Sequence, residues 1–252
     1  MAAGSVRIRL IQAGAVAAVF AGFMALSAAF PFFPPPAAVL KTTLGLLQTG
    51  EIYPHLLVTL YETGVGFAIA IVLGIAIGLA LGGNRIIGET FEPIILAAYA
   101  VPKIILLPIL LAIFGVGLEA KIANAAIHGV FPVLLNTIVG VREVNRTLLK
   151  LGRSMKATRW QTFQKIVFPS TVLPVFTGIR IGLGFAVLGS LLAELFEAQI
   201  GLGFLVVHFY NNAQIGEMLA VILFVFILTM SVNALMMLIE RSLSRWRVTL
   251  TF

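Results

Sequence analysis

Residues Leu60–Gly82 read LYETGVGFAIAIVLGIAIGLALG, and Glu62 is the one charged side chain among these 23 residues. A helix that crosses the hydrocarbon core of a membrane needs roughly 20 mostly apolar residues, so the stretch predicts a membrane-spanning helix. Gly74, Gly78 and Gly82 recur at every fourth position and therefore share one face of that helix. Small residues on such a face let a second helix approach closely within lipid.

The composition of the whole chain also indicates a membrane protein. Hydrophobic residues make up 60% and charged residues 11% of the 252 residues, and the mean hydropathy is +1.07. An average soluble domain is about 25% charged. We predict an all-α polytopic membrane protein whose six candidate spans cover roughly residues 10–30, 56–82, 91–114, 122–141, 175–196 and 218–239.

The first span has a second interpretation. Arg7, Arg9, the apolar run behind them and the small residues Ser27–Ala29 also fit a cleaved signal peptide. The run is about 20 residues long, more than the apolar region of a signal peptide usually has. Pro31–Pro36 then ends the helix, so we expect a retained span.

The basic residues between the spans predict the orientation, because cytoplasmic loops carry an excess of Lys and Arg. With the N-terminus inside, the outer segments hold two basic residues, Lys41 and Lys121, and the inner segments hold thirteen. The thirteen are Arg7, Arg9, Arg85, Arg142, Arg146, Lys150, Arg153, Lys156, Arg159, Lys165, Arg241, Arg245 and Arg247. We therefore expect a cytoplasmic segment 1–9, one transmembrane domain 10–247 and a cytoplasmic tail 248–252 in a bacterial inner membrane. The net charge of +7 reflects this topology and requires no nucleic-acid partner.

Several kinds of active site are excluded by missing residue types. The chain has no cysteine, and its ten acidic residues are all glutamate. Thiolate metal sites, aspartate-based cation sites and a phosphate-binding loop ending in Gly-Lys-Ser or Gly-Lys-Thr are therefore absent from the sequence. His55, His128 and His208 lack metal-type spacing, so we predict no metal, no cofactor and no catalytic residue in this chain. Any nucleotide hydrolysis would then occur on another chain.

Glycines and prolines indicate how the spans pack. Gly178 and Gly182 repeat the four-residue spacing in span five. We expect both glycine series to form packing contacts within the chain, with a seam between subunits or a moving pore wall as the alternatives. Prolines in spans three and four free backbone carbonyls, which membranes tolerate only beside neighbouring groups or cavity water. These prolines, Pro102, Pro108 and Pro132, therefore indicate bent helices around a cavity.

Polar side chains at membrane depth usually face the interior of a bundle or an aqueous path. Six of them are candidates to line a path through the membrane, although several can equally lie at the membrane boundary. They are Lys103, Asn124, His128, Asn136, Arg180 and Glu194, and Glu62 and Asn233 lie at similar depth.

The inner loop 142–174 holds seven of the seventeen basic residues. Its pattern predicts one helix over Arg142–Ser154 and a second that begins near Thr158 and ends at Pro169. Thr158 and Gln161 have the spacing of a capping box. Each helix has an apolar face, formed by Val144, Leu148, Leu149 and Leu151 and by Trp160, Phe163, Ile166 and Val167. Two such helices make a compact knob on which a soluble partner would dock.

This loop and five other stretches resemble the membrane subunits of binding-protein-dependent ABC importers of the nitrate, sulfonate and taurine branch. The stretches are Leu60–Gly82, Phe91–Ile122, Phe131–Val144, Phe168–Phe196 and Ile200–Val206, and the resemblance runs from about Leu56 to Arg247. The family's loop carries Glu-Ala-Ala, then Gly after three residues, then Ile-x-Leu-Pro after nine more. Anchored on Pro169, Ile166 and Phe168 take the Ile and Leu places, Lys156 takes the Gly place and Lys150–Gly152 take the Glu-Ala-Ala places. The match is good over Ile166–Pro169, and the sequence departs from the family's motif over Lys150–Lys156.

The resemblance implies a pathway for a small solute between two permease chains, in a homodimer or occasionally a heterodimer. It implies ABC ATPase subunits below, which bind ATP and Mg²⁺, and an extracytoplasmic solute-binding protein above. The solute would be an organic or inorganic anion or a vitamin precursor. The implied coupling element on the ATPase consists of Leu148, Leu149, Gly152, Arg153, Lys156, Thr158, Trp160, Phe163, Ile166 and Pro169. A positive-φ turn at Lys156, where the family has glycine, would cost roughly 1 kcal/mol, so a different turn is the alternative at this position.

Two other function classes stay open. An ion-coupled secondary transporter would use Glu62, His128 or Glu194 as a relay. An intramembrane enzyme would need a convergent acid, base or metal set, and the scattered polar residues show no such spacing. The segment Glu194–Glu217 contains Ile200–Phe204 and no basic residue, and it forms either a half-helix gate or a turn.

Overall fold

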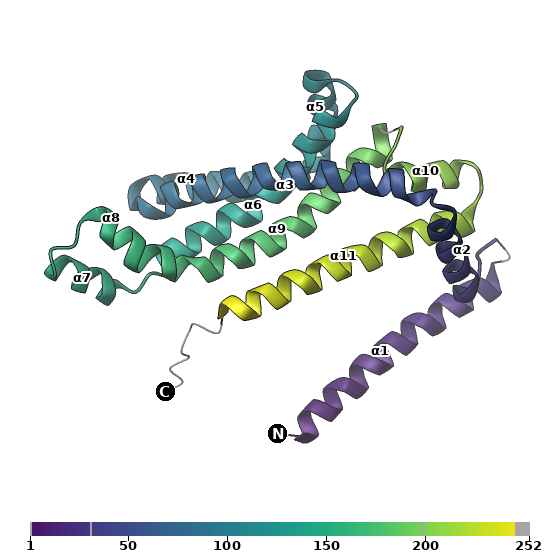
Figure 1. Ribbon diagram of the computed structural model, residues 1–252, viewed down its shortest axis with the longest axis horizontal. Coiled ribbons are helices and arrows are strands. Elements are labelled where there is room, and N and C mark those ends of the chain that lie inside the picture. The colour runs from purple at the N-terminus through teal and green to yellow at the C-terminus, as the bar shows by residue number, and fades with distance from the viewer. Residues whose placement is uncertain (1, 31, 198, 245–252) are drawn as a thin grey trace.

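The structure is a computed structural model that describes residues 2–30, 32–197 and 199–244 (Figure 1). The predicted tail 248–252, Arg245 and Arg247 lie outside these residues. The described chain consists of helices joined by turns, which confirms the all-α prediction. In order these are α1 (Ala2–Ala29), α2 (Pro36–Thr49), α3 (Ile52–Gly83), α4 (Arg85–Ala100), η1 (Lys103–Leu106), α5 (Leu107–Phe114), α6 (Leu118–Arg142), α7 (Arg146–Ser154), α8 (Arg159–Thr162), η2 (Phe163–Val167), α9 (Phe168–Glu197), α10 (Leu202–Asn211) and α11 (Ile215–Ser244).

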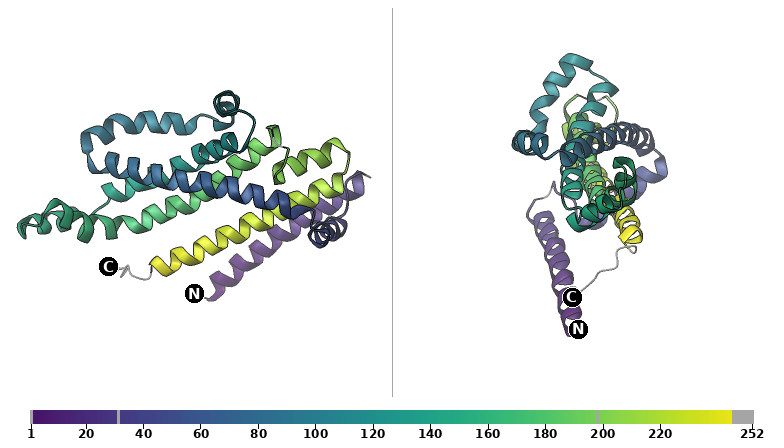
Figure 2. Two further views of the ribbon diagram at one scale, coloured as in Figure 1. Left: turned by 45° about the horizontal axis from the view of Figure 1, so that its top comes forward. Right: turned by 90° about the vertical axis from the view of Figure 1, so that its left-hand side faces the viewer.

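Three long helices, α3, α6 and α9, lie side by side and form the centre of the bundle (Figures 1 and 2). Helices α7 and α8 lie at one end of this bundle, and α2 and α10 lie at the opposite end (Figure 1). Helix α1 stands off the bundle in the right-hand view of Figure 2, and none of its Ile11–Ala29 stretch is buried. The fold therefore has a tightly packed centre and more loosely attached outer helices.

Five helices of the described ranges are long and apolar enough to cross a membrane. They cover Ile11–Ala29, Ile52–Gly83, Leu118–Arg142, Arg159–Phe196 and Ile215–Ser242. A sixth span is present if the bent pair Arg85–Ala100 and Lys103–Phe114 is taken together. These helices confirm the prediction of a polytopic protein with about six spans.

The span predicted over residues 91–114 is bent next to Pro102, which confirms the bend that its prolines indicated. Helix α4 ends at Ala100, and the following segment meets it at an angle of 87°. Val101 is extended, with φ −66° and ψ 132°, because the ring of Pro102 crowds the backbone of the residue before it. The bend directs α5 away from the bundle (Figure 1).

Two loop boundaries also differ from the prediction. Helix α6 continues to Arg142, so the first loop helix begins at Arg146 instead of Arg142. Pro169 does not end the second loop helix, because the π turn η2 connects α8 directly to α9. In this turn the Phe168 amide donates to the Phe163 carbonyl, five residues back, so the hydrogen-bond register shifts just before the proline.

The glycine faces of α3 and α9 hold α6 between them. A Cβ added to Gly78 would lie 2.5 Å from the Thr137 Cβ, and one added to Gly178 would lie 2.7 Å from the Asn136 Cβ. Both distances are too short for real carbon atoms, so the helices can approach this closely only through glycine. The structure places all five predicted packing glycines against α6: Gly74, Gly78, Gly82, Gly178 and Gly182.

A separate apolar cluster joins α10 to the end of the bundle away from the knob. It is formed by Val39, Leu46, Ile52, Leu202, Leu205, Phe209, Ala220 and Val221, from α2, α3, α10 and α11. Of the two predicted forms of the segment Glu194–Glu217, the structure shows the half-helix, α10, which follows Gly201 at φ +132°.

Candidate functional site

The loop 142–174 contains a knob of two short helices, which we define as residues 146–168 (Figure 1). The Asn145 side chain accepts a hydrogen bond from the Thr147 amide at 2.8 Å and so begins α7. The Thr158 hydroxyl accepts from the Gln161 amide at 3.2 Å, and the Gln161 side chain accepts from the Thr158 amide at 2.9 Å. These two bonds confirm the predicted capping box.

The turn between α7 and α8 has a backbone conformation that favours glycine. Lys156 adopts φ +55°, the left-handed region that the family's glycine permits at this place in the motif, so the turn keeps the family's geometry in spite of the cost for lysine. Its amide donates to the Arg153 carbonyl at 2.9 Å, and the Ala157 amide donates to the Gly152 carbonyl at 3.0 Å. This pair of bonds is the Schellman pattern that ends a helix at a left-handed residue. The knob therefore keeps a tight turn although a lysine occupies the position.

Replacing Lys156 with glycine is expected to stabilise the protein by about 1 kcal/mol, because glycine reaches the left-handed region without a Cβ clash. The midpoint of thermal unfolding of the full-length protein in detergent should rise by roughly 2–4 °C. Lys150→Gly, at an exposed position within α7, is the matched control and should lower the midpoint through its helix propensity. A lower midpoint for Lys156→Gly would contradict the strain argument.

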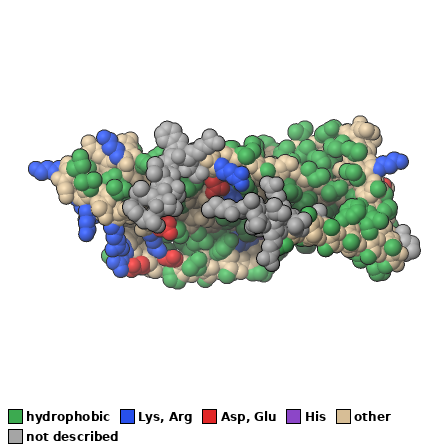
Figure 3. Space-filling view, turned by 90° about the horizontal axis from the view of Figure 1, so that it is seen from below, with side chains coloured by type: hydrophobic (Ala, Val, Ile, Leu, Met, Phe, Trp, Pro, Cys, Tyr) green, Lys and Arg blue, Asp and Glu red, His purple; other side chains and the backbone are tan. Residues whose placement is uncertain are grey.

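The knob exposes an apolar surface that we call the knob face. It consists of Leu148, Leu151, Met155, Trp160 and Phe168, whose exposed fractions are 42, 54, 73, 64 and 56%. The Trp160 ring stacks on Phe163 at 5.7 Å between centroids, and Phe163 lies 6.3 Å from Phe168. Basic side chains gather at this same end of the molecule (Figure 3). An apolar patch rimmed by polar residues marks a site of protein interaction.

The other predicted knob residues support this face from within. Gly152 is buried, and a Cβ added to it would approach the Ile166 Cδ1 to 3.0 Å. Leu149 and Phe163 are half-buried and line a hollow between the knob and the ends of α3 and α6. Arg153 and Pro169 are exposed. The knob thus has its own small interior and presents its aromatic rings outward.

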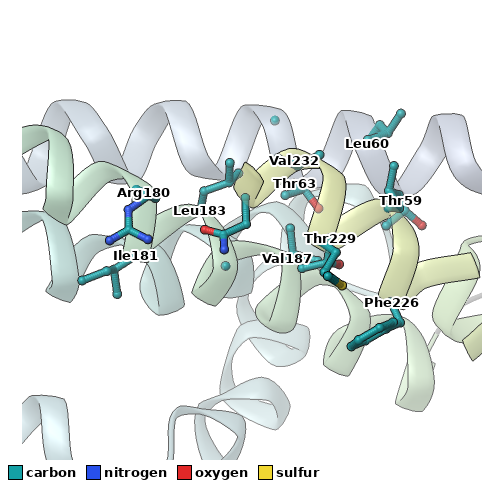
Figure 4. Close-up of a pocket in the computed structure, with 15 residues that line it drawn as sticks. Thr59, Leu60, Thr63, Arg180, Ile181, Leu183, Val187, Phe226, Thr229 and Val232 are labelled. Atoms are coloured by element: carbon teal, nitrogen blue, oxygen red, sulfur yellow. The ribbon is translucent and has the colours of Figure 1, made fainter. Parts of the chain in front are cut away.

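A cavity of about 470 Å³ lies between α3, α9 and α11 (Figure 4). Its wall is mostly apolar, and Thr59, Thr63, Arg180, Thr229 and Asn233 supply the polar groups. Arg180 forms an ion pair of 2.8 Å with Glu240, which also accepts a 2.6 Å hydrogen bond from the Thr177 hydroxyl. Because α9 begins at the knob, Arg180 lies toward the knob end of the cavity and joins α9 to α11 there.

The predicted pathway residues do not come together at one place. Arg180 alone among the six lines this cavity. Lys103 lies at the bend after α4, where its ammonium group donates to the Tyr99 carbonyl at 2.9 Å. The same ammonium lies 4.5 Å from the centre of the Tyr99 ring and 5.0 Å from that of Phe131.

Three further candidates lie on α6 and bond to backbone groups. The side-chain amide of Asn124 donates to the backbone carbonyl of Gly189 at 2.7 Å. His128 Nδ1 contacts the backbone carbonyl of Asn124 at 2.8 Å. The side-chain amide of Asn136 donates to the backbone carbonyl of Pro132 at 2.9 Å. That carbonyl lies one turn before Asn136, so its bond is within the helix. Of these three contacts, the one from Asn124 joins α6 to α9, and the other two lie within α6.

Glu194 lies at the opposite end from the knob, where α9 meets α10. Its carboxylate accepts from the Thr59 hydroxyl at 2.6 Å and from the Gly203 amide at 2.7 Å. The Leu202 amide donates in turn to the Thr59 hydroxyl at 2.9 Å. Glu194 therefore caps the first turn of α10 and connects it to α3.

The structure also shows an ion pair that the sequence analysis missed. Lys121 was expected in an outer loop, but it lies in α6 with 5% exposure and donates to Glu62 at 2.7 Å. Glu62 was expected at membrane depth and as a possible relay residue, without a partner on another helix. The two residues are 59 positions apart, so no local pattern in a single sequence connects them. Among the described residues no group of three potential ligands gathers to hold a metal ion.

Comparison with known proteins identifies a family, related permeases and a similar solved structure. Residues 70–247 match the family described as binding-protein-dependent transport system inner membrane component. The chain is 28% identical to the aliphatic sulfonates transport permease protein SsuC of Bacillus subtilis, over 85% of this chain and 78% of that one. It is 32% identical to the nitrate import permease protein NrtB of Synechocystis, over 66% of this chain and 61% of that one. The fold is similar to a chain of the inward-facing MetNI methionine ABC transporter, with a TM-score of 0.61, 23% identity and coverage of 79% and 97%.

Proposed function

The chain belongs to the family of binding-protein-dependent transport system inner membrane components, and we propose that two copies of it enclose the pathway of an importer for a small anion. It is the transmembrane subunit of an ABC importer of the nitrate, sulfonate and taurine branch. As a transport permease it is not an enzyme. In this proposal ATP and Mg²⁺ bind to separate ATPase subunits, and a solute-binding protein delivers the solute from the outside.

The knob face supports the docking of an ATPase at this end. Trp160 is 64% exposed although it is a large aromatic residue, and its ring stacks on that of Phe163. Rigid aromatic and arginine side chains dominate the energy of protein interfaces. The knob is also joined to α9 without a break, through the π turn η2. A push on the knob would therefore move α9, which lines the cavity.

The orientation in this proposal has the knob in the cytoplasm. Seven basic residues lie in the loop 142–174, and Lys and Arg side chains gather at the knob end (Figure 3). Cytoplasmic segments carry such an excess. Helix α10 and the Glu194 cap then face outward, toward the solute-binding protein.

The cavity between α3, α9 and α11 supports the choice of an anion. Arg180 brings a guanidinium group to a mostly apolar wall along which Thr63 and Thr229 also lie. In this proposal the anion would compete with Glu240, the present partner of Arg180, for that group. The relatives named above are described as permeases for sulfonates and nitrate, which are both anions. Guanidinium groups bind such planar or tetrahedral oxyanions through paired N–H donors.

The test is reconstitution of the full-length chain in liposomes with its ATPase and its solute-binding protein. We expect uptake of radiolabelled nitrate or an alkanesulfonate only when ATP and both partners are present. Uptake by the chain alone, driven by an ion gradient, would instead favour the ion-coupled secondary transporter. Liposomes that carry the ATPase without this chain are the control for leakage.

A further inference from the structure

Two carboxyl groups and one ammonium group are buried together at the end of the bundle that holds α10. Glu62 of α3 is 0% exposed, Glu194 of α9 is 1% exposed and Lys121 of α6 is 5% exposed. The Lys121 ammonium donates to Glu62 Oε1 at 2.7 Å. Thr59, which donates to Glu194, lies three residues before Glu62 on the same face of α3, so the two carboxyl groups are neighbours. If both carboxyl groups were ionised, the cluster would carry an unbalanced negative charge in an environment that disfavours it.

The other ionisable groups nearby do not supply the missing positive charge to Glu62 through a hydrogen bond. On α3, His55 Nδ1 bonds to the backbone of Gly201 at 3.1 Å, and on α6, His128 Nδ1 bonds to the Asn124 carbonyl. Lys103 bonds to the Tyr99 carbonyl. On α10, His208 Nε2 contacts the side-chain amide of Asn212 at 3.3 Å. A proton on one of the two carboxyl groups would balance the charge instead.

The hydrogen bonds identify which oxygen can carry that proton. Both Glu194 oxygens already accept, Oε1 from the Thr59 hydroxyl and Oε2 from the Gly203 amide. Glu62 Oε1 accepts from Lys121, whereas Glu62 Oε2 is buried and has no hydrogen-bond partner among the described residues. An ionised carboxyl group has acceptors only, and a protonated one has a donor as well. Of the four carboxyl oxygens, Glu62 Oε2 is the one with no hydrogen-bond partner among the described residues, so a proton there would form a new hydrogen bond without breaking an existing one.

We propose that Glu62 and Glu194 form a buried proton-binding site, in which Glu62 Oε2 holds the proton and donates it in a hydrogen bond to the Glu194 carboxylate. The cluster is then neutral, with one ammonium, one carboxylate and one carboxylic acid. Each of the four carboxyl oxygens also takes part in a hydrogen bond, which removes the unsatisfied atom.

The bound proton connects four helices at this end of the bundle. Glu194 contacts α10 through Gly203 and α3 through Thr59, while Glu62 contacts α6 through Lys121. Position 201, next to the Glu194 carboxyl group, requires glycine, because a Cβ on Gly201 would lie 2.3 Å from the Glu194 carboxyl carbon. Movement of α10 away from the bundle would break the bonds to Glu194 and leave its charge beside a free carboxylic acid.

Two substitutions of equal size test the site. Glu62→Gln keeps an oxygen for Lys121 and supplies an N–H donor to Glu194, so it reproduces the protonated form. Glu194→Gln replaces one accepting oxygen with an NH₂ group, which cannot accept from Thr59 or Gly203. For the full-length protein in detergent, we expect Glu62→Gln to change the thermal midpoint by less than about 2 °C and Glu194→Gln to lower it by roughly 5 °C or more.

Infrared spectroscopy provides a second measurement, which detects a protonated carboxyl group directly and is made on variants whose thermal midpoint shows that they are folded. A buried carboxylic acid gives a C=O band separate from that of carboxylates. We expect this band in the wild-type protein and its loss in Glu62→Gln. A midpoint for Glu62→Gln as low as that of Glu194→Gln, or a band that survives Glu62→Gln, would overturn the assignment. Neither measurement uses the ATPase or the transported solute, so the outcome is independent of the proposed transport function.

Discussion

Replacing both Trp160 and Phe163 with alanine is expected to abolish stable binding of the ATPase and ATP-driven uptake. Trp160 is the largest side chain of the knob face, and its ring is held against Phe163 at 5.7 Å. Truncating a central aromatic residue of an interface typically costs about 2 kcal/mol or more. Two such losses would weaken binding by roughly a thousandfold.

The measurement is copurification of the ATPase with the tagged permease, followed by uptake in liposomes. Tyr210→Ala is a matched control, because Tyr210 is also 64% exposed but lies on α10 at the far end of the bundle. This variant should retain the ATPase. The midpoint of thermal unfolding should change little in the Trp160→Ala single variant, which separates a docking defect from misfolding. Full ATPase binding and uptake by the double variant would contradict the docking proposal.

Gly78→Ala is expected to destabilise the bundle strongly. The added Cβ would lie 2.5 Å from the Thr137 Cβ and 2.9 Å from the Leu134 carbonyl oxygen. The carbonyl belongs to the backbone of α6 and cannot rotate away, so α3 and α6 would have to separate. Overpacking of this kind typically costs about 1–3 kcal/mol, and separation of the helices adds the loss of their other contacts. We expect the thermal midpoint to fall by roughly 5 °C or more.

Gly64→Ala on the same helix is the control for this substitution. A Cβ added to Gly64 meets no described atom of the rest of the bundle within 4 Å. Alanine also has the higher helix propensity, by about 1 kcal/mol, so this variant should be as stable as the wild type or more stable. Equal midpoints for the two variants would show that the glycine face does not determine the approach of α6.

Much of the fold could be predicted from the sequence because lipid imposes a simple pattern. The length and apolarity of Leu60–Gly82 predicted a spanning helix, and α3 covers it. The bend at Pro102 was visible as a proline, but its angle of 87° depends on where α5 finds contacts. The boundary at Pro169 was wrong because a π turn can carry a helix into a proline, and no short pattern in the chain indicates such a turn.

In the candidate site, too, local features could be predicted from the sequence and long-range contacts could not. The capping box of Thr158 could be predicted, because it depends on two residues three positions apart. The left-handed turn at Lys156 could not, because the lysine in the family's glycine place favours a different turn. The six pathway candidates were chosen by depth, and the structure distributes them over α6, the bend at Lys103, the cavity and the start of α10. Depth along a helix does not specify which way a side chain points.

The sequence by itself determined the class of protein, the spans, the basic loop and the capping box of the knob, since these follow from composition and short-range spacing. Only the tertiary structure decided that Lys121 pairs with Glu62, that Arg180 pairs with Glu240, and that Glu194 caps α10. The first two pairs join residues about 60 positions apart, on different helices. The contact of Lys121 with Glu62 depends on how closely the glycine face of α3 allows α6 to approach, and that of Arg180 with Glu240 depends on how α11 packs on α9. Both depend on the rotation of each helix about its axis.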